Sequence, residues 1–159
     1  MDKDVSDLKT AIGRLIEENN LHYCLECGKC SAVCPMLDFY GEYAYDRSPR
    51  GIVEQLSLEP ESTEGEALWY CLTCRECTFY CPSGINFQRF MMALRDDLLA
   101  RGHTKFAMFC PTCKTYTMPK KEFEFLIKGT DLSKARDLLE VCPKCKKADY
   151  VKTLHRTAR

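Results

Sequence analysis

The chain lacks any long apolar run. No apolar stretch in its 159 residues approaches the roughly 18 consecutive apolar residues of a membrane-spanning helix. Met1 to Asp7 is acidic, and the apolar segment of a secretory signal does not follow it. We therefore expect a soluble, cytoplasmic protein that would reach a membrane only through a partner.

Catalytic motifs are also scarce. The three histidines, His22, His103 and His155, are scattered singly, and we interpret them as surface or loop residues. No G-x-G-x-x-G phrase indicates a dinucleotide site. The sequence therefore predicts no complete catalytic site in this chain itself.

Cysteine, by contrast, is abundant, with 12 residues. Eight lie in two copies of the pattern C-x2-C-x2-C-x3-C-P, and each position of the second copy follows its partner by 47 residues. This spacing matches the bacterial ferredoxin pattern that binds cubane 4Fe–4S clusters through thiolates. The two copies, called here the first and the second phrase, are Cys24, Cys27, Cys30, Cys34 and Cys71, Cys74, Cys77, Cys81.

In two-cluster ferredoxins the fourth cysteine of each phrase ligates the other cluster. The pattern therefore predicts one 4Fe–4S cluster on Cys24, Cys27, Cys30 and Cys81, and another on Cys71, Cys74, Cys77 and Cys34. An uncrossed arrangement would use the same eight ligands and stays open.

Residues inside the phrases are candidates for tuning the cluster potentials. Gly28 is expected to allow close approach of the backbone to the cluster. Lys29 and Arg75 would favour the reduced state, and Glu26 and Glu76 would oppose it. The alternative is that these four are solvated surface charges.

The remaining four cysteines form two C-x2-C pairs, Cys110/Cys113 and Cys142/Cys145, separated by 28 residues. Four thiolates so spaced predict a tetrahedral metal site, as in zinc ribbons and rubredoxin-type iron sites. Rubredoxins usually place glycine after the second cysteine, whereas Lys114 and Lys146 stand here, so we favour zinc over iron. A disulfide scaffold is the alternative, but no cysteine is left outside a ligand spacing.

Charge divides the chain. Residues 1–100 carry 9 Lys and Arg against 17 Asp and Glu, a net of −8, and residues 101–159 carry 14 against 6, a net of +8. We therefore predict two domains, 1–101 and 102–159, with the boundary near Arg101-Gly102.

Helical signals dominate the first domain. An amphipathic helix is predicted from Asp4 to about Asn19, within an N-terminal segment 1–20. Ser48-Pro49 predicts a second helix start, and Asn86 a third, in a helix that Gly102 closes. A polar linker is expected from Glu59 to Glu64.

The basic tail is expected to hold a helix over 131–140 and a small core, which metal binding would support. That core would comprise Tyr116, Phe123, Phe125 and Ile127. The expected fold is mainly α: an α-helical ferredoxin domain followed by a small four-cysteine, zinc-ribbon or rubredoxin-like α+β module.

Residues 22–95 resemble the helical two-cluster ferredoxin module found in the C-type, iron–sulfur subunits of heterodisulfide reductases. The matching features are the paired phrases, the segments 48–52 and 81–85, and Trp69-Tyr70-Cys71. The resemblance implies an electron relay between a flavin-containing, A-type protein and a catalytic, B-type protein of such a complex. The Cys-Cys-Gly motifs of that catalytic partner are absent, since no two cysteines are adjacent here.

Two alternatives remain. Similar modules occur in succinate dehydrogenase, fumarate reductase, and glycolate-oxidase-like and glycerol-3-phosphate dehydrogenase subunits, which would make this the iron–sulfur component of a quinone-linked dehydrogenase. The basic tail would also suit a nucleic-acid-binding redox sensor. We favour docking of the tail on an acidic protein partner over nucleic acid.

Overall fold

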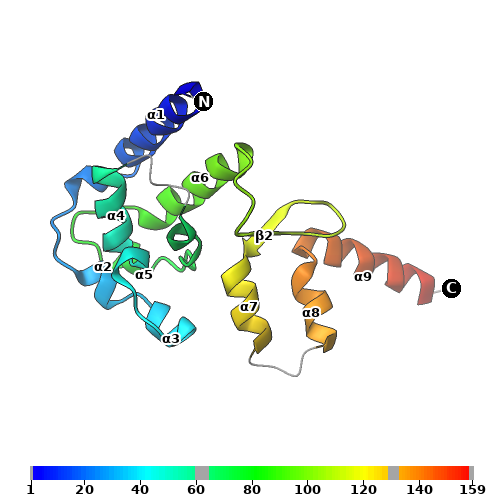
Figure 1. The fold of residues 1–159 in the computed structure, drawn as a ribbon. Helices are drawn as coiled ribbons and strands as arrows, with labels where there is room; N and C mark the ends of the chain where they lie inside the picture. The colour runs from blue at the N-terminus through cyan, green and yellow to red at the C-terminus, as the bar shows by residue number, and fades with distance from the viewer. Residues whose placement is uncertain (1, 60–64, 129–132, 158–159) are drawn as a thin grey trace. The chain divides into compact units, whose positions relative to one another are not determined.

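The computed structural model describes residues 2–59, 65–128 and 133–157. Most of the predicted linker over 59–64 therefore lies outside the described residues. The chain divides into two compact units, one ending at His103 and the other beginning at Thr104. The described residues are mainly helical, with one two-stranded sheet in the second unit (Figure 1). None of the described helices is both long and apolar enough to cross a membrane.

The first unit consists of helices connected by cysteine-bearing loops. Its three long helices are α1 (Asp2–Glu18), α4 (Pro49–Leu58) and α6 (Phe87–Ala100). Its short α-helices are α2 (Lys29–Ala32), α3 (Met36–Tyr40) and α5 (Glu76–Phe79). Single 3-10 turns are η1 (Leu21–Tyr23), η2 (Tyr45–Arg47) and η3 (Glu66–Trp69).

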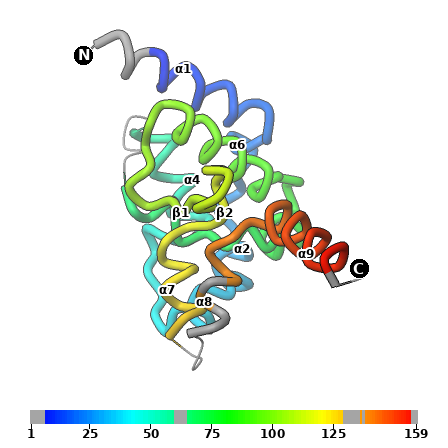
Figure 2. Tube along the Cα trace, turned by 90° about the vertical axis from the view of Figure 1, so that its right-hand side faces the viewer, coloured from blue at the N-terminus to red at the C-terminus, as the bar shows by residue number. Residues whose placement is uncertain are grey.

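Helices α1 and α6 pack against each other and form much of the core (Figures 1 and 2). The apolar stripe of α1 was predicted; its members Leu8, Ile12 and Leu15 are buried, and Ile16 is half-buried. The side chains of Asp4, Val5 and Ser6 lie outside the described residues. In α6 the buried stripe includes Phe90, Met91, Leu94 and Leu98.

The start of α4 depends on a close backbone approach. The Ser48 hydroxyl accepts a hydrogen bond from the Gly51 N–H at 3.1 Å and donates one to the Tyr45 carbonyl at 2.7 Å. Pro49 occupies the first turn, as predicted. A Cβ on Gly51 would collide with the Tyr45 carbonyl oxygen, so only glycine fits where α4 crosses η2.

Both predicted ends of α6 are confirmed. The Asn86 side chain accepts a hydrogen bond from the Arg89 N–H at 3.2 Å. At the other end Gly102 has φ +90°, its N–H donates to Leu99, and the His103 N–H donates to Leu98. These paired bonds form a Schellman motif, which ends the helix and the first unit together.

The second unit combines a β-hairpin with three helices. Strands β1 (Ala107–Phe109) and β2 (Tyr116–Pro119) pair antiparallel, with Met108 opposite Met118. Helices α7 (Lys120–Lys128) and α8 (Ser133–Glu140) lie side by side (Figures 1 and 2), and α9 (Pro143–Thr157) follows. The predicted helix over 131–140 is thus present from Ser133, and Asp131 lies outside the described residues.

The small core of this unit is only partly the predicted one. Phe123 is buried, with Ala107, Cys110 and Cys142. Tyr116 and Ile127 are half-buried, and Phe125 is exposed, which corrects the expectation for Phe125. Phe125 lies two residues after Phe123 in α7, and residues two apart on a helix do not share a face.

Candidate metal centres

The two cysteine phrases fold as copies of one loop. Gly28 has φ 74° and ψ −5° at the start of α2, and Arg75 has φ 76° and ψ −7° at the start of α5. Two positions earlier, Glu26 and Thr73 both have φ 51°. Helices α2 and α5 contact each other, so the two loops are brought together within the first unit.

Each of two neighbouring cavities brings together three cysteines of one phrase and the last cysteine of the other. One of them, the first cavity, is lined by Cys24, Cys27, Cys30 and Cys81. The other, the second cavity, is lined by Cys71, Cys74, Cys77 and Cys34. Pro49, Cys77 and Phe87 line both, so the cavities are adjacent. This grouping is the crossed one that the phrases predict, and thiolate donors facing a cavity are what a 4Fe–4S cluster requires.

Burial and mutual proximity shape the acidity of these thiols. Desolvation raises the pKa of Cys77 to about 12, and the neighbouring sulfurs of Cys71, Cys74, Cys30 and Cys34 add to the rise. Burial likewise raises the pKa of Cys30 and of Cys34. For Cys34 the next repulsive groups are Cys71 and Cys74 of the other phrase. Crowded thiols of this kind resist ionisation until a cation or cluster neutralises them, so ligation would release protons.

Residues 20–85 match the family of the 4Fe-4S dicluster domain. The match supports a ferredoxin-like iron–sulfur domain in this part of the chain. Binding of 4Fe–4S clusters and a role in electron transfer follow from this match together with the cysteine loops. Comparisons with curated proteins and with solved structures gave no match.

The charged residues inside the phrases of this iron–sulfur protein are all exposed. Glu26 and Lys29 line the first cavity and Arg75 lines the second, whereas Glu76 lines neither. Glu26 is paired with Arg50 at 3.1 Å, and Arg50 also donates to the Glu26 carbonyl at 2.5 Å. The charge of Glu26 is therefore largely compensated, and Arg50 holds the loop between Cys24 and Cys27.

Some supporting residues gave no clear signal in the sequence. Gln88 lines the second cavity, where its side chain donates to the Thr73 carbonyl at 2.8 Å and its N–H donates to the Thr78 hydroxyl at 3.1 Å. These bonds join α6 to both sides of the second phrase. A glutamine in the first turn of a helix is common, and only the long-range fold shows which loop it meets.

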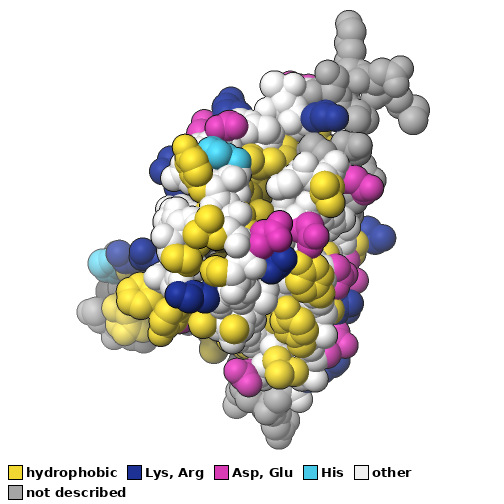
Figure 3. Space-filling view, turned by 90° about the vertical axis from the view of Figure 1, so that its left-hand side faces the viewer, with side chains coloured by type: hydrophobic (Ala, Val, Ile, Leu, Met, Phe, Trp, Pro, Cys, Tyr) yellow, Lys and Arg dark blue, Asp and Glu magenta, His cyan; other side chains and the backbone are white. Residues whose placement is uncertain are grey.

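Large apolar side chains are exposed beside the cysteines. Leu25, next to Cys24, is 70% exposed, and Phe79, between Cys77 and Cys81, is 80% exposed. Figure 3 shows apolar side chains at the surface among acidic and basic groups. Exposed groups of this size close to a redox centre are typical of a surface that a partner covers.

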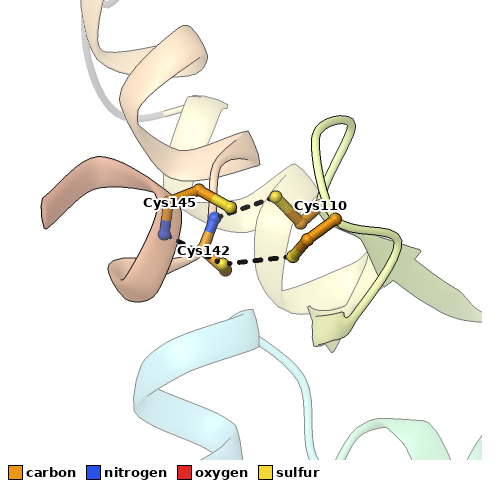
Figure 4. Close-up of side chains that lie close together, drawn as sticks. Cys110, Cys142 and Cys145 are labelled. Atoms are coloured by element: carbon orange, nitrogen blue, oxygen red, sulfur yellow. Dashed lines mark hydrogen bonds between the residues drawn. The ribbon is translucent and has the colours of Figure 1, made fainter. Parts of the chain in front are cut away.

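The cysteines of the second unit converge in one place. The sulfurs of Cys110, Cys113, Cys142 and Cys145 all lie within 4.8 Å of one another, and those of Cys113 and Cys142 are 3.5 Å apart (Figure 4). Four thiolates bound tetrahedrally at about 2.3 Å from Zn²⁺ would have sulfurs about 3.8 Å apart. The residues therefore fit a four-thiolate metal site.

The two cysteine pairs reach this site on different elements. Cys110 and Cys113 lie in the loop between β1 and β2, but Cys142 and Cys145 lie at the start of α9. The predicted α+β module therefore has its first cysteine pair in a hairpin loop and its second pair at a helix start. Pro143 opens the helix there, so the chain turns directly into α9 after Cys142.

Backbone donors favour thiolate at this site. The N–H of Cys142 donates to Cys110 Sγ at 3.4 Å, and this bond is the main reason that the pKa of Cys110 is lowered to about 6. The N–H of Cys145 donates to Cys142 Sγ at 3.4 Å. A hydrogen bond with the Thr115 hydroxyl lowers the pKa of Cys113. Hydrogen bonding to Cys113 and Cys142 raises the pKa of Cys145 to about 12.

Proposed function

We propose that this protein is an electron-transfer component of a heterodisulfide-reductase-like complex, carrying two 4Fe–4S clusters and one structural zinc ion. The observation that carries the proposal is the pair of adjacent cavities, each lined by cysteines drawn from both phrases. A 4Fe–4S cluster supplies one-electron transfer without bond making or breaking at the protein.

The chain's own residues support a relay. Each phrase contributes to both cavities, so neither site is complete without the other. Cys77 and Phe87 lie between the two cavities and line both. This arrangement keeps two redox centres next to each other and shields the space between them from water, since Cys77 and Phe87 are buried.

The proposed partners are a flavin-containing protein and a catalytic protein, of the A and B types of heterodisulfide reductase respectively. Two surfaces support partner docking. One is apolar and lies beside the cysteine phrases, at Leu25 and Phe79. The other is basic and lies on α9, and its exposed residues are Lys144, Lys147, Tyr150, Lys152, Leu154 and Arg156. The second surface suits an acidic partner.

For the second unit we propose zinc rather than iron. Lys114 has φ +59°, the left-handed conformation that glycine takes in rubredoxin loops, so the loop is formed without glycine. Lys146 belongs to α9, where its N–H donates to the Cys142 carbonyl at 3.0 Å and is not available to a sulfur. The residues after the two cysteine pairs thus differ from the glycines that are usual in rubredoxin-type iron sites.

Iron, acid-labile sulfide and zinc assays on anaerobically purified protein test the proposal. We expect about eight iron and eight sulfide per chain, and one zinc. About four iron per chain would contradict the presence of two 4Fe–4S clusters. Rubredoxin-type iron in place of zinc would contradict the zinc assignment. Copurifying proteins then decide the complex: a soluble flavoprotein supports the heterodisulfide-reductase-like assembly, and a cytochrome b supports the quinone-linked alternative.

A further inference from the structure

Arg95 is a buried cation without an acidic partner. Its residue is only 4% exposed, and it lies on α6 one turn after Met91 and one turn before Leu98, both of which are fully buried. Among the described residues, no carboxylate forms an ion pair with Arg95. Arg95 is also the one charged residue that is buried in this part of the chain. A charged residue on an apolar stripe is a departure from the helical pattern.

The guanidinium of Arg95 holds the backbone that leads into the second phrase. Its Nε and Nη2 donate to the Leu68 carbonyl at 3.1 and 2.6 Å, and Nη2 also donates to the Cys71 carbonyl at 2.7 Å. The Trp69 ring centroid lies 5.5 Å from the guanidinium carbon. The positive charge therefore sits against the backbone of a cysteine that lines the second cavity.

Carbonyl groups satisfy the donors of Arg95 but do not neutralise its charge. A charge taken out of water is costly unless an opposite charge compensates it. The Cys71 that Arg95 contacts belongs to the thiolate set of Cys34, Cys71, Cys74 and Cys77, which becomes anionic when it holds a cluster. The bound cluster would thus supply the counter-charge that the protein does not.

The other positive charges near the cavities should affect a bound cluster less than Arg95, because each is either paired with a carboxylate or exposed to solvent. Arg47 lines the second cavity but is paired with Glu42 at 2.5 Å, and Arg75 is exposed. In the first cavity Arg50 is paired with Glu26, and Lys29 is exposed. Solvent screens exposed charges far more than a buried one.

We infer that Arg95 is a positioning residue that stabilises the reduced state of the cluster held by Cys34, Cys71, Cys74 and Cys77, and so gives it the higher reduction potential of the two. The inference rests on the proposed two-cluster function. One electron that enters at either cluster then resides on the second. The first cluster is oxidised by one electron as the second is reduced by one, with no bond or proton transferred.

The test is an anaerobic redox titration of the full-length holoprotein, followed by EPR. Variants with Cys27→Ser and Cys74→Ser assign the signals to the first and second cluster. In the wild type the second cluster should be reduced first. Arg95→Gln keeps a hydrogen-bond donor but removes the charge. At the wild-type midpoint potential it should lower the ratio of reduced to oxidised second cluster about tenfold, which equals a shift of about 59 mV for one electron. The first cluster should shift much less.

Two controls separate charge from structure. Arg95→Lys keeps the charge and should leave the order and the midpoints close to wild type. Arg89→Gln removes an exposed charge from the same helix and should change neither. Equal shifts of both clusters in Arg95→Gln, or equal effects of the Gln and Lys substitutions, would overturn the inference.

If the Arg95→Gln variant does not assemble the second cluster, the order in which the two wild-type clusters are reduced still tests the role of Arg95. Reduction of the first cluster before the second overturns the role of Arg95, and reduction of the second first, retained in Arg95→Lys, supports it. A wild-type iron content near four per chain, about half that of two cubanes, would instead overturn the two-cluster function itself. About eight iron with unshifted potentials in Arg95→Gln would overturn the role of Arg95 alone.

Discussion

Gly28 and Arg75 occupy the same left-handed backbone conformation, at φ 74° and φ 76°, 47 residues apart in the chain. A Cβ on Gly28 would meet no atom of the protein within 4 Å, so within the protein itself the left-handed φ is the reason for glycine at this position. Arg75 adopts the same conformation with a side chain, which costs an L-residue about 1–2 kcal/mol.

Exchange of the residue types at these two positions should have opposite effects. Arg75→Gly should stabilise the folded state by up to about 1 kcal/mol, because relief of the left-handed strain outweighs the added chain entropy of glycine. Gly28→Ala should destabilise it by about 1 kcal/mol. The temperature at which the visible cluster absorbance is lost, measured anaerobically, reports both. Arg75→Lys keeps the strain and should behave as wild type, and shifts of the same sign for the two main variants would contradict the assignment.

Gly51 should tolerate no side chain. Gly51→Ala would force α4 away from η2, because the new methyl group collides with the Tyr45 carbonyl, and overpacking of this kind costs about 1–3 kcal/mol. Gly13→Ala is the matched control. Its Cβ would meet nothing within 4 Å inside α1, so it should stabilise by about 0.5–1 kcal/mol. Chemical denaturation of both variants checks the contrast, and a neutral Gly51→Ala would rule out the tight crossing.

Crossed ligation can be tested by pairs of cysteine substitutions. In the crossed arrangement Cys34→Ser and Cys74→Ser affect the same cluster, so the double variant should keep one intact cluster and about four iron. Cys34→Ser combined with Cys27→Ser should disturb both clusters and lose the remaining cubane signal. Iron content and EPR of the reduced proteins measure this. The reverse pattern, with one cubane surviving only in the Cys27 pairing, would establish uncrossed ligation.

Removal of the metal from the second unit should unfold that unit while the first remains folded. Among its described side chains the unit buries few besides Cys110 and Cys142, so we expect metal binding to supply much of its stability. A zinc chelator at neutral pH should reduce the helical circular dichroism but leave the cluster absorbance intact. Acidification should release the metal as well, because protons compete for thiolates. Cys113→Ser should reproduce the effect without chelator, and Thr112→Ser, beside it in the loop, should not.

Much of this protein could be predicted from local pattern. Ser48, Asn86 and Gly102 marked helix ends because caps depend on a few neighbouring residues, and the repeated phrases predicted two loops of the same kind. Phe125 was assigned to a core that it does not join. Which face of α7 meets the hairpin depends on packing that its own sequence does not encode.

The sequence by itself determined the repeated loop and the ends of α6 at Asn86 and Gly102, and it predicts the ligand types, because each depends on residues close together in the chain. Only the tertiary structure decided which cysteines share a cavity and that Arg95 meets Cys71. Those relationships join residues 24 to 57 positions apart. They arise when distant segments pack around a common core, and the packing selects one of several pairings that the local patterns allow equally.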